Sequence, residues 1–142
     1  MLKGIPKIIS PELLKVLMEM GHGDEIVIAD GNFPGQRINS RCIRCDGHGT
    51  VELLEAILKL FPLDTYENPV YIMEKVKGDT VETPIWEDYA RIVAEHTEKK
   101  IEGIERFAFY ERAKSAYAVI MSGESALYAN IILKKGVVKD GE

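Results

Sequence analysis

The amino-acid sequence predicts an α/β fold: a single three-layer domain over residues 1–142, with a mostly parallel central sheet and helices on both faces. Segments with the 3.6-residue apolar spacing of helices alternate with short apolar runs that are typical of strands. Two of these runs, residues 26–29 and 117–121, are apolar throughout, which indicates strands buried on both faces. The chain of 142 residues has no repeat and no evident linker, so its length suits one domain.

The first predicted helix covers residues 11–20. Ser10 can cap it, and Pro11 suits its first position. Its apolar residues share one face: Leu13, Val16, Leu17 and Met20. Gly21 is expected to end the helix as a left-handed cap. The strand at residues 26–29 follows, and an Asp-Gly pair breaks it.

The middle of the chain continues the alternation. Residues 32–40 are rich in turn-forming types and are predicted as a loop, and residues 41–45 as a short strand. The helix predicted over residues 50–61 begins at a capping threonine and ends before a proline. A strand at residues 70–73 and a helix at residues 84–96 complete this part.

The last third of the chain is predicted to be mainly strand. Residues 106–110 alternate like a strand, and residues 111–115 suit a single helical turn. The apolar run at residues 117–121 is a strand, and a last strand is expected at residues 129–133. This closing pair is expected to add an antiparallel edge to the sheet.

Composition and charge exclude several classes of function. The net charge is −5, and no basic tract exceeds two residues, which argues against a nucleic-acid partner. The longest apolar run is far shorter than the roughly 18 residues of a membrane helix, so no membrane association is expected. Phosphate-binding glycine loops and the G-x-S-x-G elbow are absent, which disfavours nucleotide and serine hydrolysis. Two cysteines and the lack of an apolar signal core favour the cytoplasm.

Two residues near the first strand can carry chemistry. Asp30 directly follows that strand, and ligands of open α/β sheets bind outside the carboxyl ends of strands. The alternative is a turn aspartate before glycine. His22 lies between two glycines, and a histidine can donate or accept a proton near neutral pH. A surface histidine without a catalytic role is the alternative.

The remaining histidines and the cysteines do not predict a metal site. Cys42, Cys45 and His48 form a C-x-x-C-x-x-H pattern, but a structural zinc site needs four ligands and no second cysteine pair exists. In a strand, residues three apart point to opposite faces. His96 falls on the apolar stripe of its helix, so we expect a packed or half-buried structural histidine.

Polar side chains late in the chain form a second candidate group. Residues 106–112 combine two arginines with three aromatic residues. As a strand, this segment would bury its two phenylalanines and present Arg106 and Tyr110 to a polar ligand. A surface ion pair of the arginine with a neighbouring glutamate is the alternative. Tyr128 and Asn130 would lie on one side of a strand start, where both can bind hydroxyl groups.

Two long stretches carry a resemblance to known proteins. They are ISPELLKVLMEMGHGDEIVIADGNFP at residues 9–34 and RFAFYERAKSAYAVIMSGESALYANIILKKGV at residues 106–137. Both resemble the fucose mutarotase and ribose pyranase family, and the resemblance covers nearly the whole chain. RFAFYER and Y-x-N-x-x-L-K-K-G are similar to the fucose branch rather than the ribose branch.

The resemblance implies an enzyme that exchanges the anomers of a fucose-like monosaccharide by opening and closing the pyranose ring, with no cofactor and no metal. It implies that His22 is the catalytic proton donor. The implied sugar-binding residues are Asp30, Arg106, Tyr128, Ala129 and Asn130. The family forms closed decameric rings, so we expect a homodecamer with sites at subunit interfaces, in which the Y-x-N element comes from the neighbouring subunit. Ala129 stands where glycine is frequent in the fucose branch.

Two other functions remain open from the sequence. A ribose pyranase would exchange pyranose and furanose forms with the same acid and base. A non-catalytic sugar-binding protein would use the same pocket without any exchange.

Overall fold

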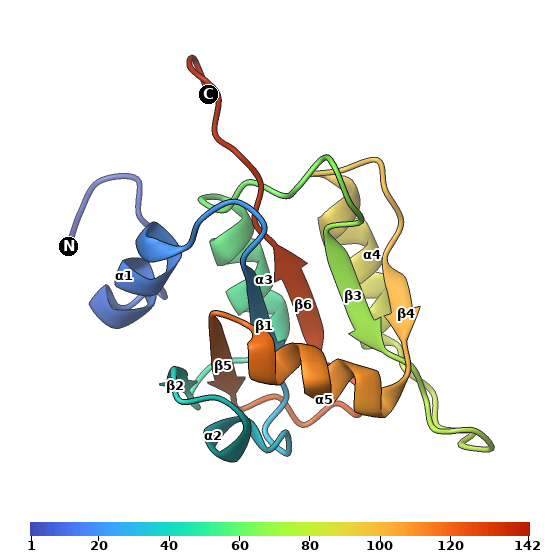
Figure 1. The fold of residues 1–142 in the computed structure, drawn as a ribbon. Helices are drawn as coiled ribbons and strands as arrows, with labels where there is room; N and C mark the ends of the chain where they lie inside the picture. The colour runs from blue at the N-terminus through green and yellow to red at the C-terminus, as the bar shows by residue number, and fades with distance from the viewer.

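The structure, a computed structural model that describes residues 1–142, contains one sheet of six strands in the order β2-β5-β1-β6-β3-β4 (Figure 1). The strands are β1 (Glu25–Ala29), β2 (Cys42–Cys45), β3 (Val70–Met73), β4 (Glu102–Ile104), β5 (Ala118–Ser122) and β6 (Ile131–Lys134). Five strands run in one direction, and β6 is antiparallel to both of its neighbours, β1 and β3. The predicted mostly parallel sheet is confirmed. The antiparallel strand, however, lies inside the sheet and not at the predicted edge.

Helices cover both faces of the sheet, which confirms the three predicted layers. They are α1 (Pro11–Glu19), α2 (Gly35–Ile38), α3 (Thr50–Leu58), α4 (Ile85–Ala94) and α5 (Arg106–Ser115). Buried side chains of α1, α3 and α4 pack on one face, and α2 and α5 pack on the other. In Figure 1, α5 crosses in front of the sheet, while α3 and α4 lie behind it.

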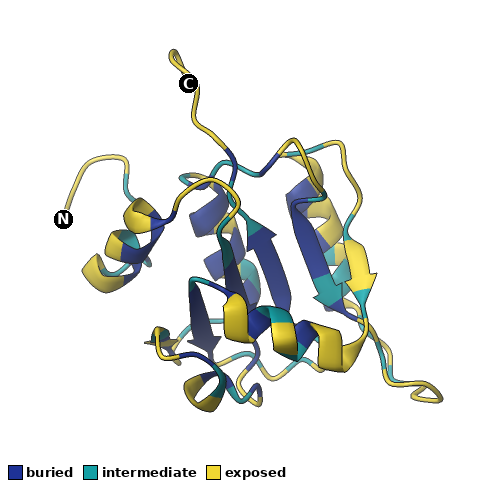
Figure 2. Ribbon diagram, in the orientation of Figure 1, coloured by how far each residue is buried: buried dark blue, intermediate teal, exposed yellow.

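Alternate residues of the central strands belong to two separate cores. In β1, Ile26 and Ile28 pack with α1, α3 and α4, whereas Val27 and Ala29 pack with α5. All four side chains are fully buried, and Figure 2 shows the same burial along β5 and β6, with β4 exposed at the edge. Burial of one such aliphatic side chain contributes roughly 1.5–3 kcal/mol. The central strands are therefore a stable frame for the polar residues at their ends.

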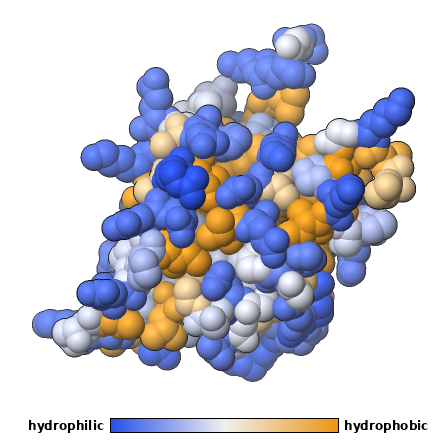
Figure 3. All heavy atoms as spheres, turned by 180° about the vertical axis from the view of Figure 1, so that it is seen from behind, coloured by the Kyte–Doolittle hydropathy of each residue, from blue (hydrophilic) through white to orange (hydrophobic).

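The helical face that Figure 1 hides mixes hydrophilic side chains with hydrophobic areas between them (Figure 3). None of the helices combines the length and the hydropathy that crossing a lipid bilayer requires. Several large apolar side chains stay exposed on the single chain, including Met18 on α1, Tyr66 after α3 and Val138 near the C-terminus.

The start of α1 follows the prediction, but its end does not. The Ser10 hydroxyl accepts a hydrogen bond from the Leu13 N–H at 3.1 Å, which confirms the cap. The helix ends at Met20 in an extended conformation, and the left-handed glycine is Gly23, with φ of 88°. The predicted left-handed cap at Gly21 is therefore wrong. The reversal occurs two residues later and directly follows the histidine of this turn.

The prediction of a strand at residues 106–110 is wrong, because this segment is the first half of α5. The Glu105 carboxylate accepts hydrogen bonds from the N–H groups of Phe107 and Ala108 and caps the helix. Phe109 and Ala113 are fully buried at helical spacing, whereas Phe107 is 63% exposed. The residues predicted as a single turn, 111–115, form the second half of the same helix.

Two short elements have no counterpart among the predictions. The four-residue helix α2 lies within the predicted loop, and the three-residue strand β4 pairs with β3 at the edge of the sheet. Short elements of this kind are fixed by tertiary packing rather than by local periodicity.

Thr50, which was predicted to cap α3, is the first residue of this helix, and Gly49 takes the capping position. The backbone N–H of Gly49 donates to the Glu52 carboxylate at 2.9 Å.

We expect Gly123→Ala to destabilise the protein by roughly 1–3 kcal/mol, since overpacking beside fixed backbone carries a cost of that order. A Cβ atom at Gly123, after β5, would lie 2.1 Å from the carbonyl oxygen of Asp46, after β2. Gly47→Ala is the matched control, because a Cβ atom there meets nothing within 4 Å. Urea unfolding of both variants measures the difference. Equal stability of the two would contradict close packing between these strand ends.

Candidate functional site

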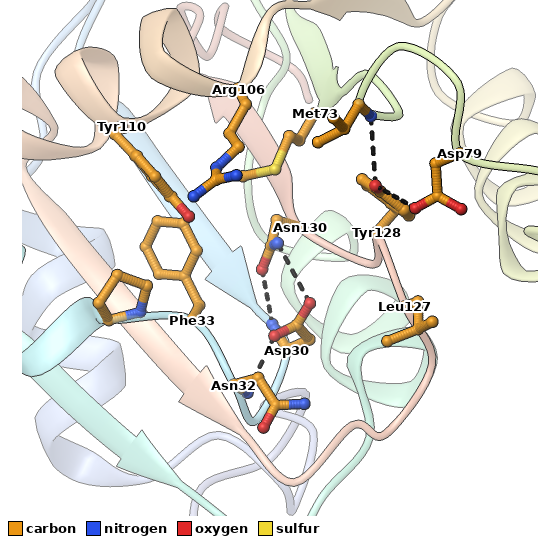
Figure 4. Close-up of a pocket in the computed structure, with 12 residues that line it drawn as sticks. Asp30, Asn32, Phe33, Met73, Asp79, Arg106, Tyr110, Leu127, Tyr128 and Asn130 are labelled. Atoms are coloured by element: carbon orange, nitrogen blue, oxygen red, sulfur yellow. Dashed lines mark hydrogen bonds between the residues drawn. The ribbon is translucent and has the colours of Figure 1, made fainter. Parts of the chain in front are cut away.

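A cavity of about 280 Å³ opens at the carboxyl ends of the parallel strands (Figure 4). Its lining is half apolar and half polar: Asp30, Asn32, Phe33, Pro34, Met73, Val76, Asp79, Arg106, Tyr110, Leu127, Tyr128 and Asn130. Apolar walls with a few convergent polar groups are typical of small-molecule sites. The size and the lining suit a small polar ligand.

The sheet topology brings the lining residues together. Asp30 follows β1 and Met73 ends β3, while Arg106 begins α5 directly after β4. Because β6 runs antiparallel, its beginning lies where its neighbours end, so Asn130 lies beside the end of β1. The cavity thus lies outside the carboxyl ends of the strands, where open α/β sheets bind ligands.

Asp30 and Asn130 form a two-hydrogen-bond pair at the base of the cavity. The Asn130 side-chain N–H₂ donates to Asp30 Oδ2 at 3.1 Å, and Asn130 Oδ1 accepts from the Asp30 N–H at 2.8 Å. The other Asp30 oxygen accepts from the Asn32 N–H at 2.9 Å. Burial raises the pKa of the Asp30 carboxyl, although these hydrogen bonds oppose that shift. The pair gives the cavity a fixed acceptor.

Tyr128 points its phenol into the same cavity from a rare backbone conformation. Its φ of 56° makes it the only non-glycine residue with a positive φ. The phenol donates to Asp79 Oδ2 at 2.6 Å and accepts from the Val76 N–H at 3.2 Å. The Asp79 carboxylate raises the pKa of Tyr128, so the phenol stays protonated near neutrality. Its proton is already donated, so toward a ligand this hydroxyl offers a lone pair.

Arg106 forms the cationic wall of the cavity. Its guanidinium lies 5.1 Å from the ring centre of Phe107 and 5.7 Å from that of Tyr110. The ion pair expected as the alternative does not form, because Glu105 caps α5 and Glu111 pairs with Lys114. The guanidinium N–H groups therefore remain available to a ligand.

His22 lies at the opposite end of β1, away from this cavity. Gly23 beside it donates its N–H to the carbonyl of Lys135, just beyond the end of β6, whereas Asp30 meets Asn130 just before β6 begins. The rise of a strand makes the five residues of β1 alone about 13 Å long. None of the principal cavities includes His22.

The histidine has a partner that sequence reasoning missed. His22 Nε2 lies 3.0 Å from Oδ1 of Asp64, whose side chain is 4% exposed, and the Tyr66 ring lies 5.4 Å away. Burial disfavours the charged form of Asp64, but hydrogen bonds from His22, Tyr66 and Glu67 hold its pKa below the usual value. The only signal in the sequence is an aspartate in a turn, which does not distinguish it from other turn aspartates.

The structure thus places four of the six predicted site residues in one cavity of one chain: Asp30, Arg106, Tyr128 and Asn130. Ala129 lies in the core below the cavity, and its side chain does not line it. The expectation that the Y-x-N element approaches Asp30 from a neighbouring subunit is wrong, because Asp30 and Asn130 bond within one chain. His22, in contrast, lies at the other end of β1, away from the cavity.

The cysteines and the other histidines behave as separate side chains. Cys45 packs with the α1, α3 and α4 side of the sheet and Cys42 with the α5 side, which confirms the predicted opposite faces. No group of three or more potential ligands of the His, Cys, Asp or Glu type comes together. His48 contacts Glu52 at 3.2 Å. His96 is exposed beyond the end of α4, so the prediction of a packed histidine is wrong.

Comparison with known proteins gives consistent similarities over nearly the full chain. The profile of the RbsD / FucU transport protein family matches residues 3–138. A curated L-fucose mutarotase of Actinobacillus pleuropneumoniae serotype 5b is 54% identical, over 96% of this chain and 97% of that protein.

Two solved structures are closely similar as well. The crystal structure of FucU from Bifidobacterium longum has a TM-score of 0.94 and 64% identity, over 96% of this chain and all of that chain. The fucose mutarotase of Streptococcus pneumoniae in complex with L-fucose has a TM-score of 0.92 and 52% identity, over 97% of this chain and all of that chain.

The raised pKa of Asp30 predicts a specific pH dependence of stability. Folding makes this carboxyl bind its proton more tightly, so the wild type should lose stability relative to Asp30→Asn as pH rises from the usual aspartate pKa through the raised one. Asp79→Asn is the matched control. The Tyr128 hydrogen bond lowers the pKa of the Asp79 carboxyl, so the wild type should gain stability relative to Asp79→Asn as pH rises, which is the opposite sign. Urea unfolding between about pH 2 and 7 measures both, because the Asp79 difference develops below the usual aspartate pKa and the Asp30 difference above it. The same sign for both variants would contradict the assigned burial of Asp30.

Proposed function

The chain belongs to the RbsD / FucU family, and on this premise we propose that it acts as an L-fucose mutarotase, an isomerase that interconverts the α and β anomers of a pyranose sugar. The relatives with this activity in their names are 50–54% identical over nearly the whole chain. The cavity supports the same substrate class, because its carboxylate, amide, phenol and guanidinium groups can bind the hydroxyl groups of a sugar.

The reaction requires only proton transfers. A base removes the proton of the hydroxyl on C1 while an acid protonates the ring oxygen, and the bond between C1 and the ring oxygen breaks. The resulting open-chain aldehyde rotates about its C1–C2 bond and closes on the other face. Uncatalysed mutarotation is not very slow, so acid–base assistance of about 10²–10⁴-fold is sufficient.

The separation of the histidine from the cavity is the observation that supports the proposal most directly. The polar groups of the cavity are suited to hydroxyls but include no histidine, and His22 is 45% exposed and lines none of the principal cavities. Histidine is the side chain whose ordinary pKa suits proton transfer near neutrality. We therefore propose that His22 of one subunit faces the cavity of another and completes the site.

The environment of His22 suits a proton donor. When Nε2–H donates to Asp64, the other ring nitrogen, Nδ1, is left to give a proton to the substrate or to take one from it. The buried Asp64 carboxylate, 3.0 Å from Nε2, fixes the orientation of the imidazole ring. The nearby Tyr66 ring, itself 79% exposed, is free to pack against the second subunit.

The assembly follows as part of the same proposal. A closed ring presents one interface repeatedly, so every cavity receives one histidine. The decamer of the resembling family is the proposed state, and exposed apolar side chains such as Met18 and Val138 suit a subunit interface. The unpaired thiols of Cys42 and Cys45 support the cytoplasm as the proposed location.

We expect His22→Ala to abolish enzymatic anomer exchange while the fold persists. Exchange NMR with L-fucose should show wild-type exchange well above that of buffer, and the variant should return it to the buffer rate. His96→Ala is the matched control, because that histidine is exposed and does not line the cavity. Near-wild-type exchange in His22→Ala would remove the histidine from the mechanism.

The same measurement separates the two other functions. Exchange of D-ribose between pyranose and furanose forms, without fucose exchange, would favour a pyranase. Binding of L-fucose without any exchange would favour a sugar-binding protein. Galactose, which carries a hydroxyl on C6 where fucose has a methyl group, tests how strictly the apolar side of the cavity selects the sugar.

The shared site predicts complementation between two inactive variants. His22→Ala and Asp30→Ala subunits, mixed equally and reassembled, should restore about a quarter of the sites, because each half of a site is wild type in half of the chains. The measurement is fucose exchange after mixing, with mixed oligomers verified by native mass spectrometry. No recovery in verified mixed oligomers would contradict the shared site and leave the activity itself untouched.

A further inference from the structure

The conformation of Tyr128 requires support from outside the cavity. A tyrosine with φ of 56° occupies a region that non-glycine residues enter only when surrounding contacts impose it. The chain reaches this residue through residues 123–130, which contain no helix or strand. The two polar cavity residues of this segment, Tyr128 and Asn130, therefore depend on contacts that hold the backbone around them.

Helix α4 supplies those contacts from behind the cavity. The Trp86 indole N–H donates to the carbonyl of Tyr128 at 2.7 Å, and the Tyr89 phenol lies 2.5 Å from the carbonyl of Ala129. The two donors are three residues apart and share one face of α4. Two successive carbonyls are thus fixed by one helix.

The donor roles follow from the number of protons that each group can donate. A carbonyl can only accept, so the single phenol proton of Tyr89 is directed to Ala129. The Thr50 hydroxyl, 2.6 Å from the same phenol, then has to donate, to this phenol or to Glu124 at 3.2 Å. Burial raises the pKa of Tyr89 far above its usual value, so its proton is present throughout the neutral range.

We infer that Trp86 and Tyr89 are positioning residues for anomer exchange: they hold the left-handed backbone at Tyr128 so that its phenol and the Asn130 amide face the sugar. This inference rests on the proposed function. Neither residue lines the cavity, and their only hydrogen bonds to the segment go to its backbone carbonyls. They act on the sugar through Tyr128 and Asn130.

A double-mutant cycle tests the inference. Trp86→Phe removes the indole donor and keeps an aromatic ring, and we expect it to lower kcat/KM for L-fucose exchange about tenfold, because small misplacement of a binding group is costly. In a Tyr128→Phe background the same change should cost clearly less, about threefold or less, since the phenol that it positions is already absent and only the Asn130 amide is left to misplace. Equal losses in the two backgrounds would overturn the inference.

Two further variants keep the test decisive if Trp86→Phe folds poorly. Tyr89→Phe removes the second donor and should show the same dependence on Tyr128. Val93→Ala loosens the packing of α4 without touching either carbonyl, so it should lower Tm and leave kcat/KM within about twofold of the wild type. A loss with Val93→Ala as large as that of the donor variants would indicate general destabilisation and overturn the inference.

A measurement without substitution addresses the contact itself. Trp86 is the only tryptophan, so its indole N–H gives a single resonance in ¹⁵N-labelled protein. We expect this resonance to be protected from hydrogen exchange and to shift when L-fucose binds. An unprotected resonance that does not move at saturating L-fucose would overturn the inference.

Failure of the proposed function has a different signature. Wild-type protein that binds L-fucose without exchanging its anomers would refute the mutarotase proposal. The positioning role is then decided by calorimetric affinity for L-fucose. Weaker binding in Trp86→Phe but not in Val93→Ala would support it, and equal binding in both would overturn it.

Discussion

The hydrogen-bonded pair of Asp30 and Asn130 depends on one topological constraint, the antiparallel strand β6 inside the sheet. If β6 ran parallel to β1, it would begin beside the amino-terminal end of β1. Asn130, which is 100 residues after Asp30 in the chain, would then not reach it, and the Asp30 carboxylate would be buried without a side-chain donor. Because β6 also pairs with β3, the segment before it passes the loop after β3, where Asp79 and Val76 hold the phenol of Tyr128. The cavity is thus a consequence of strand order.

The chemistry of the cavity is the reason for proposing that a second subunit completes the catalytic site. Burial raises the pKa of Asp30, yet its backbone and side-chain hydrogen bonds oppose that shift, and the Asp79 carboxylate raises the pKa of Tyr128, so the phenol keeps its proton near neutrality. These groups orient hydroxyls well but exchange protons poorly near pH 7. Histidine is the residue type suited to proton transfer near neutral pH, and the buried partner Asp64 anchors His22 at the other end of β1. In the proposed shared site, assembly would control activity, because a single chain holds His22 and the cavity at opposite ends of β1.

The sequence predicted the frame of the fold better than the details of the site. Apolar runs such as residues 26–29 mark buried strands without ambiguity, and the place of Asp30 after one of them follows directly. The strand prediction for residues 106–110 failed because five alternating residues are also compatible with a helix. The second buried residue of that helix, Ala113, lies outside these five residues. Asp64 and Asp79 look like ordinary turn aspartates, since their roles come from partners 42 and 49 residues away. Contacts of that range leave no local pattern.

The segment of residues 123–130 shows how an irregular stretch can be as well fixed as a strand. Glu124 binds the N–H groups of Thr50 and Ala126 with its two carboxylate oxygens, and α4 binds the carbonyls of the last turn. Each bond contributes only about 0.5–1.5 kcal/mol, but an unmade bond at a buried carbonyl costs about 1–3 kcal/mol. The left-handed Tyr128 is therefore favoured over relaxed alternatives chiefly because relaxing it would leave the carbonyls of Tyr128 and Ala129 without their donors. A strained residue at the cavity is stable as long as the helix behind it is in place.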